Sequence, residues 1–492
     1  MTEVADSCMS HRIQFVYRDI LFQRFAGSGP EACFLMGGSL PYGKTVNQMS
    51  ASAAQAMQVR IAARPADQRV FLMLQGPHGP FFNQLARLLR AAGSEVWRAG
   101  FNAGDEFFWS DKSHFLRHTG TPEEWPQHLE RIIVEKRVTD LVLYGDVRPV
   151  HAAARHAADR HGLVLHVFEE GYLRPFWITY ERGGSNGHSA LVGISLREMR
   201  NALRGNGGEH RSRPPARWGD MRQHKFYGAL YHFFVLIANR CYVGYRTHRQ
   251  IGVLQEFRLN LRRLLMTPID MIAQWRETRA VRRGGFPYVL VPMQLEHDSN
   301  FVAHSPYTRM ADFTDEVLTE FANSAPRHHH IVFKAHPLED GRGGIRKAIA
   351  DRAQALGILH RVHYVRGGKL AQLMNQARSA VTVNSTSAQQ ALWRGLPVKA
   401  MGRAVYDKPG IVSHQSLAEF LTDPKAPNAT AYRQYRDFLL ESSQVPGGFY
   451  SERSRGHALR IVADLMLAPE DPYVALLAGR GKHRQQMETY TE

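Results

Sequence analysis

Two adjacent carboxylates, Glu169 and Glu170, follow the apolar run 163–168 and precede Gly171. Like charges held this close can raise the pKa of one carboxyl group, so the pair can supply a nucleophile or a general base. Arg174 lies four residues beyond Glu170 and can balance their charge. The competing interpretation is an ordinary solvated acidic turn, and the motif alone does not separate the two.

Two later motifs have the chemistry of an anion site. Lys334, His336 and Pro337 follow an apolar run, and a lysine and a histidine at a strand end can hold a phosphate or a carboxylate. A run of hydroxyl residues precedes a predicted helix, where side-chain hydroxyls and free backbone N–H groups favour an anion. The alternatives are a turn histidine and a plain helix N-cap. The hydroxyl residues are Ser385, Thr386 and Ser387.

Weaker candidates follow two earlier apolar runs. Gln75 and Gly76 come after the run 70–74, and Asn102 and Asp105 come after a predicted strand. The glycine spacing is not GxGxxG and the chain has no Walker motif, which excludes the usual dinucleotide and P-loop sites. Each of these loops can equally be ordinary turn chemistry.

The elements that must position these residues alternate between strands and helices, which is typical of parallel βαβ units. Predicted strands such as 140–144 and 331–334 fall in two series, with an Arg-rich helical segment between them. Open α/β sheets bind ligands at the carboxyl ends of their strands, where the motifs above lie. We therefore predict two Rossmann-like domains that face a cleft. The predicted parts are an extension (1–68), a first domain (69–190), a basic helical insert (191–285), a second domain (286–460) and a helical tail (461–492).

The positive charge is concentrated in the insert. The chain of 492 residues has 62 Lys and Arg and 45 Asp and Glu, a net charge of +17. Residues 191–285 hold 18 basic and 6 acidic residues, which is 18 − 6, or +12. A basic segment around the apolar run 226–241 fits a membrane surface, a buried helix with solvated flanks, or nucleic acid. No RRM, zinc-finger or helix-turn-helix pattern supports nucleic acid, so we expect no nucleic-acid partner.

Cysteine usage and hydropathy suggest the compartment. The three cysteines, Cys8, Cys33 and Cys241, have no CxxC spacing and suit a reducing environment without a zinc module. The first ten residues show no secretory signal, and no run reaches the ~18 apolar residues of a spanning helix. The sequence predicts a cytoplasmic protein that is peripheral to a membrane.

The ordered set of motifs resembles the capsule polysaccharide biosynthesis and export family of KpsS/LipB type, the retaining β-Kdo transferases. The resemblance covers about residues 69–460. The motifs that carry it are residues 74–77 with 81–82, 101–105 with 108–109, 169–175, 334–337, 382–387, and 395–399 running on to 406–410. Ala388 stands where the family more often has glycine, and residues 1–68 match nothing in the family.

This resemblance implies a GT-B-like fold and CMP-Kdo as the donor. No Asp-x-Asp pair lies at the end of a predicted strand, so we expect no metal ion or other cofactor. It implies transfer of the first β-Kdo to an anionic glycerophospholipid, phosphatidylglycerol or its lyso form, to start the poly-Kdo linker of the capsule. The site would be the cytoplasmic face of the inner membrane, beside other capsule biosynthesis and export proteins. The alternatives are a related transferase that uses another CMP-sugar or acceptor, and a non-catalytic export or scaffold protein.

The same resemblance implies roles for single residues. Glu170 would be the nucleophile and Glu169 its partner, with Asp105 as the reserve candidate, because retention commonly proceeds through an enzyme carboxylate. His336 and the hydroxyls of residues 385–387 would hold the CMP phosphate. Arg174 and Lys334 would neutralise the carboxylate of Kdo.

Overall fold

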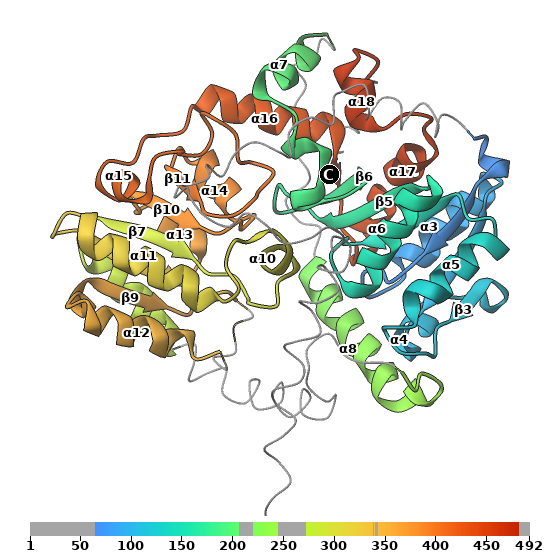
Figure 1. Cartoon of the computed structure of the whole chain (residues 1–492), viewed down its shortest axis with the longest axis horizontal. Coiled ribbons are helices and arrows are strands. Elements are labelled where there is room, and N and C mark those ends of the chain that lie inside the picture. Colours follow the sequence, from blue (N-terminus) through green and yellow to red (C-terminus); the bar gives the residue numbers. More distant parts are fainter. Residues whose placement is uncertain (1–63, 206–219, 245–271, 338, 340–342, 482–492) are drawn as a thin grey trace, which may run out of the picture. The chain divides into compact units, whose positions relative to one another are not determined.

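The computed structural model describes residues 64–205, 220–244, 272–337, 339 and 343–481. Most of the predicted extension and the arginine-rich stretches 206–219 and 245–271 of the insert lie outside these described residues. Figure 1 labels many of the helices and strands of the two α/β halves.

The first half is built on a seven-stranded sheet in the order β12-β6-β5-β4-β1-β2-β3. The first five strands of the chain are parallel, whereas β6 and β12 continue the sheet in antiparallel pairs. The strands are β1 (Val70–Met73), β2 (Glu95–Gly100), β3 (Phe115–Arg117), β4 (Asp140–Tyr144), β5 (Val164–Glu170), β6 (Trp177–Arg182) and β12 (Gln444–Pro446). The helices between them are α3 (Phe81–Ala91), α4 (Ala103–Phe107), α5 (Trp125–Glu135) and α6 (Pro149–His161).

Apolar side chains cover both faces of this sheet, as parallel strands require. Phe71 and Phe168 pack with α3 on one face, and Leu72 and Val167 pack with α5 and α6 on the other. Neighbouring residues of one strand thus contribute to different cores, because successive side chains point to opposite faces.

The second half has a five-stranded parallel sheet in the order β11-β10-β7-β8-β9. Its strands are β7 (Tyr288–Pro292), β8 (His330–Lys334), β9 (Val362–Val365), β10 (Ser379–Thr382) and β11 (Val398–Ala400). Its helices are α10 (Ser299–His304), α11 (Met310–Ser324), α12 (Ile345–Ala355), α13 (Leu370–Met374), α14 (Ala388–Trp393), α15 (Leu417–Thr422) and α16 (Ala429–Ser442). The predicted GT-B-like architecture of two Rossmann-like halves is confirmed.

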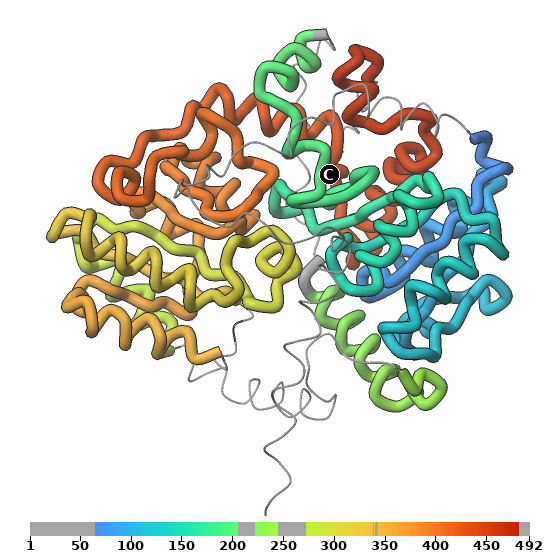
Figure 2. Tube along the Cα trace, viewed as in Figure 1, coloured from blue at the N-terminus to red at the C-terminus, as the bar shows by residue number. Residues whose placement is uncertain are grey.

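The end of the chain differs from the prediction of a second domain up to residue 460 and a separate tail. Residues 444–446 form β12, which pairs with β6 of the first sheet, and α17 (Glu452–Leu467) packs on α3. Val445 and Val462 join the same core as Phe168, so burial of their side chains ties this segment to the first half. Figure 2 shows the red C-terminal segment beside the first half. The chain thus crosses back to the first half, and α18 (Pro472–Leu477) follows α17.

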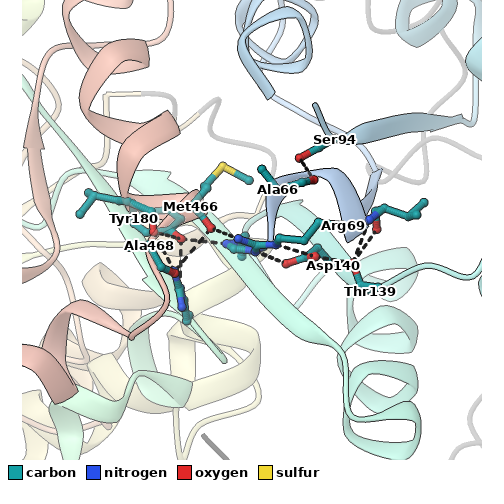
Figure 3. Close-up of polar contacts among 12 residues, drawn as sticks. Ala66, Arg69, Ser94, Thr139, Asp140, Tyr180, Met466 and Ala468 are labelled. Carbon is teal, nitrogen blue, oxygen red and sulfur yellow. Dashed lines mark hydrogen bonds and ion pairs between the residues drawn. The ribbon is translucent and has the colours of Figure 1, made fainter. Parts of the chain in front are cut away.

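A buried ionic network fastens this returning segment to the amino end of the first sheet (Figure 3). Arg69 donates from Nε to Asp140 Oδ2 at 3.2 Å and from Nη1 to the carbonyl of Met466 at 2.7 Å. His166 Nε2 lies 2.8 Å from Asp140 Oδ1. Burial alone would raise the pKa of Asp140, but hydrogen bonds from His166 and Arg69 hold it below the usual range. The network lies at the strand ends opposite the predicted functional edge and has a structural role.

The described part of the insert is helical, as the sequence predicts. It comprises α7 (Leu196–Gly205), which packs against α16, then α8 (Asp220–Ala238) and the helical residues 272–283. Tyr231 and Val235 of α8 are buried, and this helix packs against α4. In the part of the chain that the structure describes, no helix is long and apolar enough to cross a membrane.

Candidate active site

Glu169 and Glu170 are the last two residues of β5, so the sheet itself fixes their directions. Because neighbouring strand residues alternate, Glu170 shares the face of Phe168 and Glu169 shares the face of Val167. The hydroxyl of Tyr144 donates to Glu170 Oε1 at 3.0 Å. Asn186 Nδ2 lies 3.5 Å from Glu169 Oε2, on the other face. The two carboxylates therefore reach the carboxyl edge of the sheet from opposite sides.

The environment of Glu169 is not that of a solvated acidic turn. Its side chain is partly buried, and burial raises its pKa to about 7. Arg148 and Arg174 oppose this rise, while the charge of Glu170 adds to it. A carboxyl group with a pKa near neutrality can both take up and release a proton under physiological conditions.

Arg174 connects this carboxylate pair with the second half. Its side chain is exposed, and its Nε donates to the carbonyl of Gly171 at 3.2 Å. Its charge acts on Glu169 and also on His336, which follows β8. Burial lowers the pKa of His336, with Asp298 opposing and Arg174 adding to the effect. Arg174 thus lies near enough to both the acidic motif and the His-Pro motif for its charge to act on each, and Pro337 of the second motif is exposed.

Lys334 supports the turn between β8 and His336. It is buried to 6% exposure, and its Nζ donates to the carbonyls of Ala335 at 2.9 Å and Arg366 at 3.1 Å. Burial lowers its pKa to about 8. Two backbone oxygens thus already bind the ammonium group that we predict to neutralise a sugar carboxylate.

The three hydroxyl residues lie at the carboxyl end of β10, before the six-residue helix α14. Ser385 Oγ and Ser387 Oγ share a hydrogen bond of 2.8 Å, and the N–H of Ser387 donates to Ser385 Oγ at 3.2 Å. Ser387 makes no side-chain capping bond, which argues against a plain N-cap. Thr386 and both serines are only partly buried, so their hydroxyls are within reach of a ligand.

Asn102 and Asp105, which follow β2, are buried and contact other residues of the first half and α8. Asp105 is exposed to only 2% and accepts hydrogen bonds from the N–H of Phe101 at 3.1 Å and from Arg98 at 3.3 Å. Asn102 caps α4 through the N–H of Asp105 and donates to the hydroxyl of Tyr231 at 2.6 Å. These contacts join α4 to the helix α8, and they argue against Asp105 as a nucleophile.

Gln75 and Gly76 belong to the same buried region. Gln75 Nε2 lies 3.4 Å from Asp105 Oδ2, and a Cβ on Gly76 would lie 2.6 Å from Phe82. Because Gly76 has no side chain, Phe82 of α3 can pack closely against the loop that precedes this helix.

Asn186 is a further candidate site residue, because its amide lies beside Glu169, and the sequence did not indicate it. It lies in the short helix η3 (Asn186–His188) with φ of +53°, a conformation that asparagine adopts more readily than most residues. Its N–H donates to the hydroxyl of Tyr172 at 2.6 Å, and that hydroxyl donates to Glu181 Oε2 at 2.8 Å. The available signal was the run Gly183-Gly184-Ser185-Asn186-Gly187, a cluster of turn residues directly after a strand.

The described residues contain no group of three or more His, Cys, Asp or Glu side chains that could hold a metal ion.

Comparison with known proteins gives one family and several relatives. The family model described as "Capsule polysaccharide biosynthesis protein" matches residues 139–450, which include every motif from Glu169 to Ser387 but not Asp105. The capsule polysaccharide modification protein LipB of Neisseria meningitidis is 32% identical over 390 residues, covering 77% of this chain and 91% of that protein. The capsule polysaccharide export protein KpsS of Escherichia coli is 29% identical over 383 residues, covering 77% and 96%.

One solved structure, the β-Kdo 2,7 transferase of Thermosulfurimonas dismutans KpsC, aligns with 80% of this chain and 100% of its own. Its sequence identity to this chain is 12% and its TM-score is 0.39.

Proposed function

The chain belongs to the family of capsule polysaccharide biosynthesis proteins, and on that premise we propose that it transfers β-Kdo from CMP-Kdo to a glycerophospholipid. The acceptor is phosphatidylglycerol or its lyso form, and the product starts the poly-Kdo linker of a capsule polymer. The reaction retains the anomeric configuration and uses no metal ion. The protein works at the cytoplasmic face of the inner membrane with other capsule biosynthesis and export proteins.

The observation that carries this proposal is the carboxylate pair at the end of β5, with Arg174 acting on both Glu169 and His336. In a double displacement, Glu170 attacks the anomeric carbon and the bond to the CMP phosphate breaks. Tyr144 orients the attacking carboxylate. Glu169 then takes the proton of the acceptor hydroxyl as that oxygen displaces Glu170, and its pKa of about 7 suits a general base.

The leaving CMP gains negative charge as its bond to the sugar breaks, so donors aimed at its phosphate stabilise the transition state. His336 and Arg174 supply donors from the strand ends of the two halves. The hydroxyls of Ser385, Thr386 and Ser387 supply further donors from the end of β10.

The acceptor side of the proposal is supported by α8. Phe226, Phe233 and Ile237 of this helix are 62%, 51% and 52% exposed, although the opposite side of α8 is buried. Exposed aromatic and aliphatic side chains in a basic segment suit a lipid surface rather than a solvated structural helix.

The test is to incubate the purified chain with CMP-Kdo and a fluorescent lyso-phosphatidylglycerol and to weigh the product by mass spectrometry. We expect one added Kdo. Replacing Glu170 by Gln should abolish transfer, and replacing His336 by Ala should slow it ~100-fold, about the effect of removing one transition-state donor. The control Glu95→Gln, an exposed carboxylate at the amino end of β2, should leave the rate unchanged.

Five other results would contradict the proposal or redirect it. Full activity of both Glu169→Gln and Glu170→Gln would remove the carboxylate mechanism, and a strict need for Mg²⁺ or Mn²⁺ would contradict the metal-free reaction. Binding of CMP-Kdo without a product would indicate a different acceptor. Preference for another CMP-sugar would indicate a different donor. Neither binding nor transfer would indicate a non-catalytic export or scaffold protein.

A further inference from the structure

His304, the last residue of α10, lies where the two halves of the chain meet. Its ring is 4.6 Å from that of His188 in η3, and the side chain is 8% exposed. A Cβ on Gly187 would collide with His304 Nδ1, so the ring can occupy this position only against a glycine. Its carbonyl accepts a hydrogen bond of 3.0 Å from the N–H of Arg403 in the second half.

Two buried nitrogens at this meeting point have no hydrogen-bond partner among the described residues. They are His304 Nε2 and the Nε of Arg155, which lies on α6 of the first half. Buried polar groups in folded proteins are nearly always paired. Arg155 is close enough for its charge to act on His304, so these two unpaired nitrogens from different halves suggest a ligand that supplies the missing acceptors.

The charge of this region fits a negatively charged ligand. Burial lowers the pKa of His304 to about 4, and the nearby His188, Arg403 and Arg155 lower it further, with Asp146 opposing. Asp146 is already occupied, because it accepts hydrogen bonds from the N–H of Ser185 at 3.1 Å and from the ring of His188 at 3.0 Å. Asp146 therefore supplies one negative charge against the two positive charges of Arg155 and Arg403.

The same residues lie beside the candidate catalytic carboxylate. Asn186, the neighbour of Gly187, is within 3.5 Å of Glu169, and a Cβ on Gly145, the neighbour of Asp146, would lie 3.3 Å from Glu169 Oε2. On the other side, Asn384 at the end of β10 donates to the carbonyl of Asn300 in α10 at 2.9 Å. The region thus lies at the carboxyl ends of strands from both sheets, where α/β proteins bind ligands.

We propose that His304, Arg155 and Arg403 form an oxyanion site that binds a carboxylate or phosphate group of a substrate next to Glu169. Arginine offers paired N–H donors that match the oxygens of either group. The proposal rests on the proposed function, because that function supplies three such groups: the carboxylate and the phosphate of the donor, and the phosphate of the acceptor. It assigns the anion-binding role to residues outside the motifs that the sequence singled out.

The test uses the full chain in calorimetric titrations with inorganic phosphate, acetate, CMP, CMP-Kdo and glycerol 3-phosphate. Arg403→Gln is the main variant, because this side chain is exposed and its replacement should not disturb folding. Arg155→Gln is the second variant. His329→Asn is the matched control, since His329 is also buried, has an unpaired Nδ1 and a pKa lowered to about 4, but lies before β8 at the opposite strand end.

We expect both arginine variants to bind at least one of these ligands tenfold or more weakly, and the control to stay within twofold of the unmodified chain. Weaker binding of CMP-Kdo but not of CMP identifies the donor carboxylate. Weaker binding of both identifies the donor phosphate, and weaker binding of glycerol 3-phosphate alone identifies the acceptor. Unchanged binding of every ligand by both arginine variants overturns the proposal.

The site and the proposed function can fail separately. If the unmodified chain binds neither CMP nor CMP-Kdo and transfers nothing, the proposed function fails, and the site is judged on phosphate, acetate and glycerol 3-phosphate. Binding of any of these that Arg403→Gln weakens tenfold supports the oxyanion site. Absence of binding for all of the ligands overturns it.

Discussion

Glu181 is a buried carboxyl group that the proposed reaction does not use. It is 1% exposed and accepts hydrogen bonds from Ser189 at 2.6 Å, from Tyr172 at 2.8 Å and from Tyr473. Burial nevertheless raises its pKa to about 7, because neutral hydroxyl donors only partly replace the water lost by a charged group. Glu181 thus links Tyr473 of α18 to Tyr172, and the hydroxyl of Tyr172 in turn binds the N–H of Asn186.

This raised pKa predicts a pH dependence of stability. The unfolded carboxyl group titrates near its ordinary value of 4.5, so between about pH 4.5 and pH 7 the folded chain holds a proton that the unfolded chain has released. The free energy of unfolding therefore falls as the pH rises through this window, by at most ~3 kcal/mol at 1.36 kcal/mol per pKa unit.

The measurement is urea unfolding of the unmodified chain and of Glu181→Gln at several pH values. The difference between the two should shift in favour of the glutamine variant as the pH rises. Buried histidines titrate in both proteins and cancel in this difference. Parallel curves would show that Glu181 has an ordinary pKa in the folded state.

At the scale of elements, the Arg69 network predicts how firmly α17 is held. Arg69 is 6% exposed and Asp140 is 1% exposed, so replacing Arg69 by Met leaves a buried carboxylate without the guanidinium of its ion pair and frees the carbonyl of Met466. Breaking a buried pair in this way commonly costs ~3–5 kcal/mol. Urea unfolding of Arg69→Met should show a loss of this size.

The matched control is Arg309→Met, which removes an exposed ion pair with Asp312. Surface pairs are screened by water and salt, so we expect little change in stability. Equal effects of the two substitutions would mean that the network at the start of β1 is not buried in solution.

Most of the sheet framework could be predicted from local patterns, because buried parallel strands appear as short apolar runs. The predicted strands 70–74, 140–144 and 331–334 correspond to β1, β4 and β8 within one residue. β12 could not be predicted in this way. Its three residues pair with β6, where Gln444 lies opposite Thr179, and no local pattern reports a pairing across such a distance in sequence.

The candidate site was predictable in part for a related reason. Glu169, Glu170 and His336 lie at strand ends in the sequence and at the edges of the sheets in the structure. Asp105 has the same kind of sequence position but is buried. A sequence does not show whether a polar side chain at a strand end points to the core or to a ligand. His304 was missed because its importance arises from contact with the other half.

At the scale of the whole molecule, the charge and the exposed apolar side chains belong to the same segment. The insert carries +12 of the net charge of +17, and its helix α8 exposes Phe226, Phe233 and Ile237 at positions seven and four residues apart. Residues at this spacing lie on one side of a helix. One face of the helix can therefore enter a lipid surface while nearby basic residues attract anionic headgroups.

This arrangement predicts binding to phosphatidylglycerol vesicles in a flotation assay, with Phe233→Ser and Ile237→Ser combined as the test variant. Each of these side chains contributes ~1.5–3 kcal/mol when fully buried in an apolar phase, and 1.4 kcal/mol corresponds to about a tenfold change. We expect at least tenfold weaker binding of the double variant, since both side chains are already exposed and their loss should not weaken the fold. The control Val134→Ser, 66% exposed on α5, should bind like the unmodified chain.

Raising the salt concentration from about 0.1 M to about 1 M shortens the screening length from ~10 Å to ~3 Å and should also weaken binding. Equal binding to neutral vesicles would remove the role of the charge, and full binding of the double variant would place the lipid contact elsewhere on the chain.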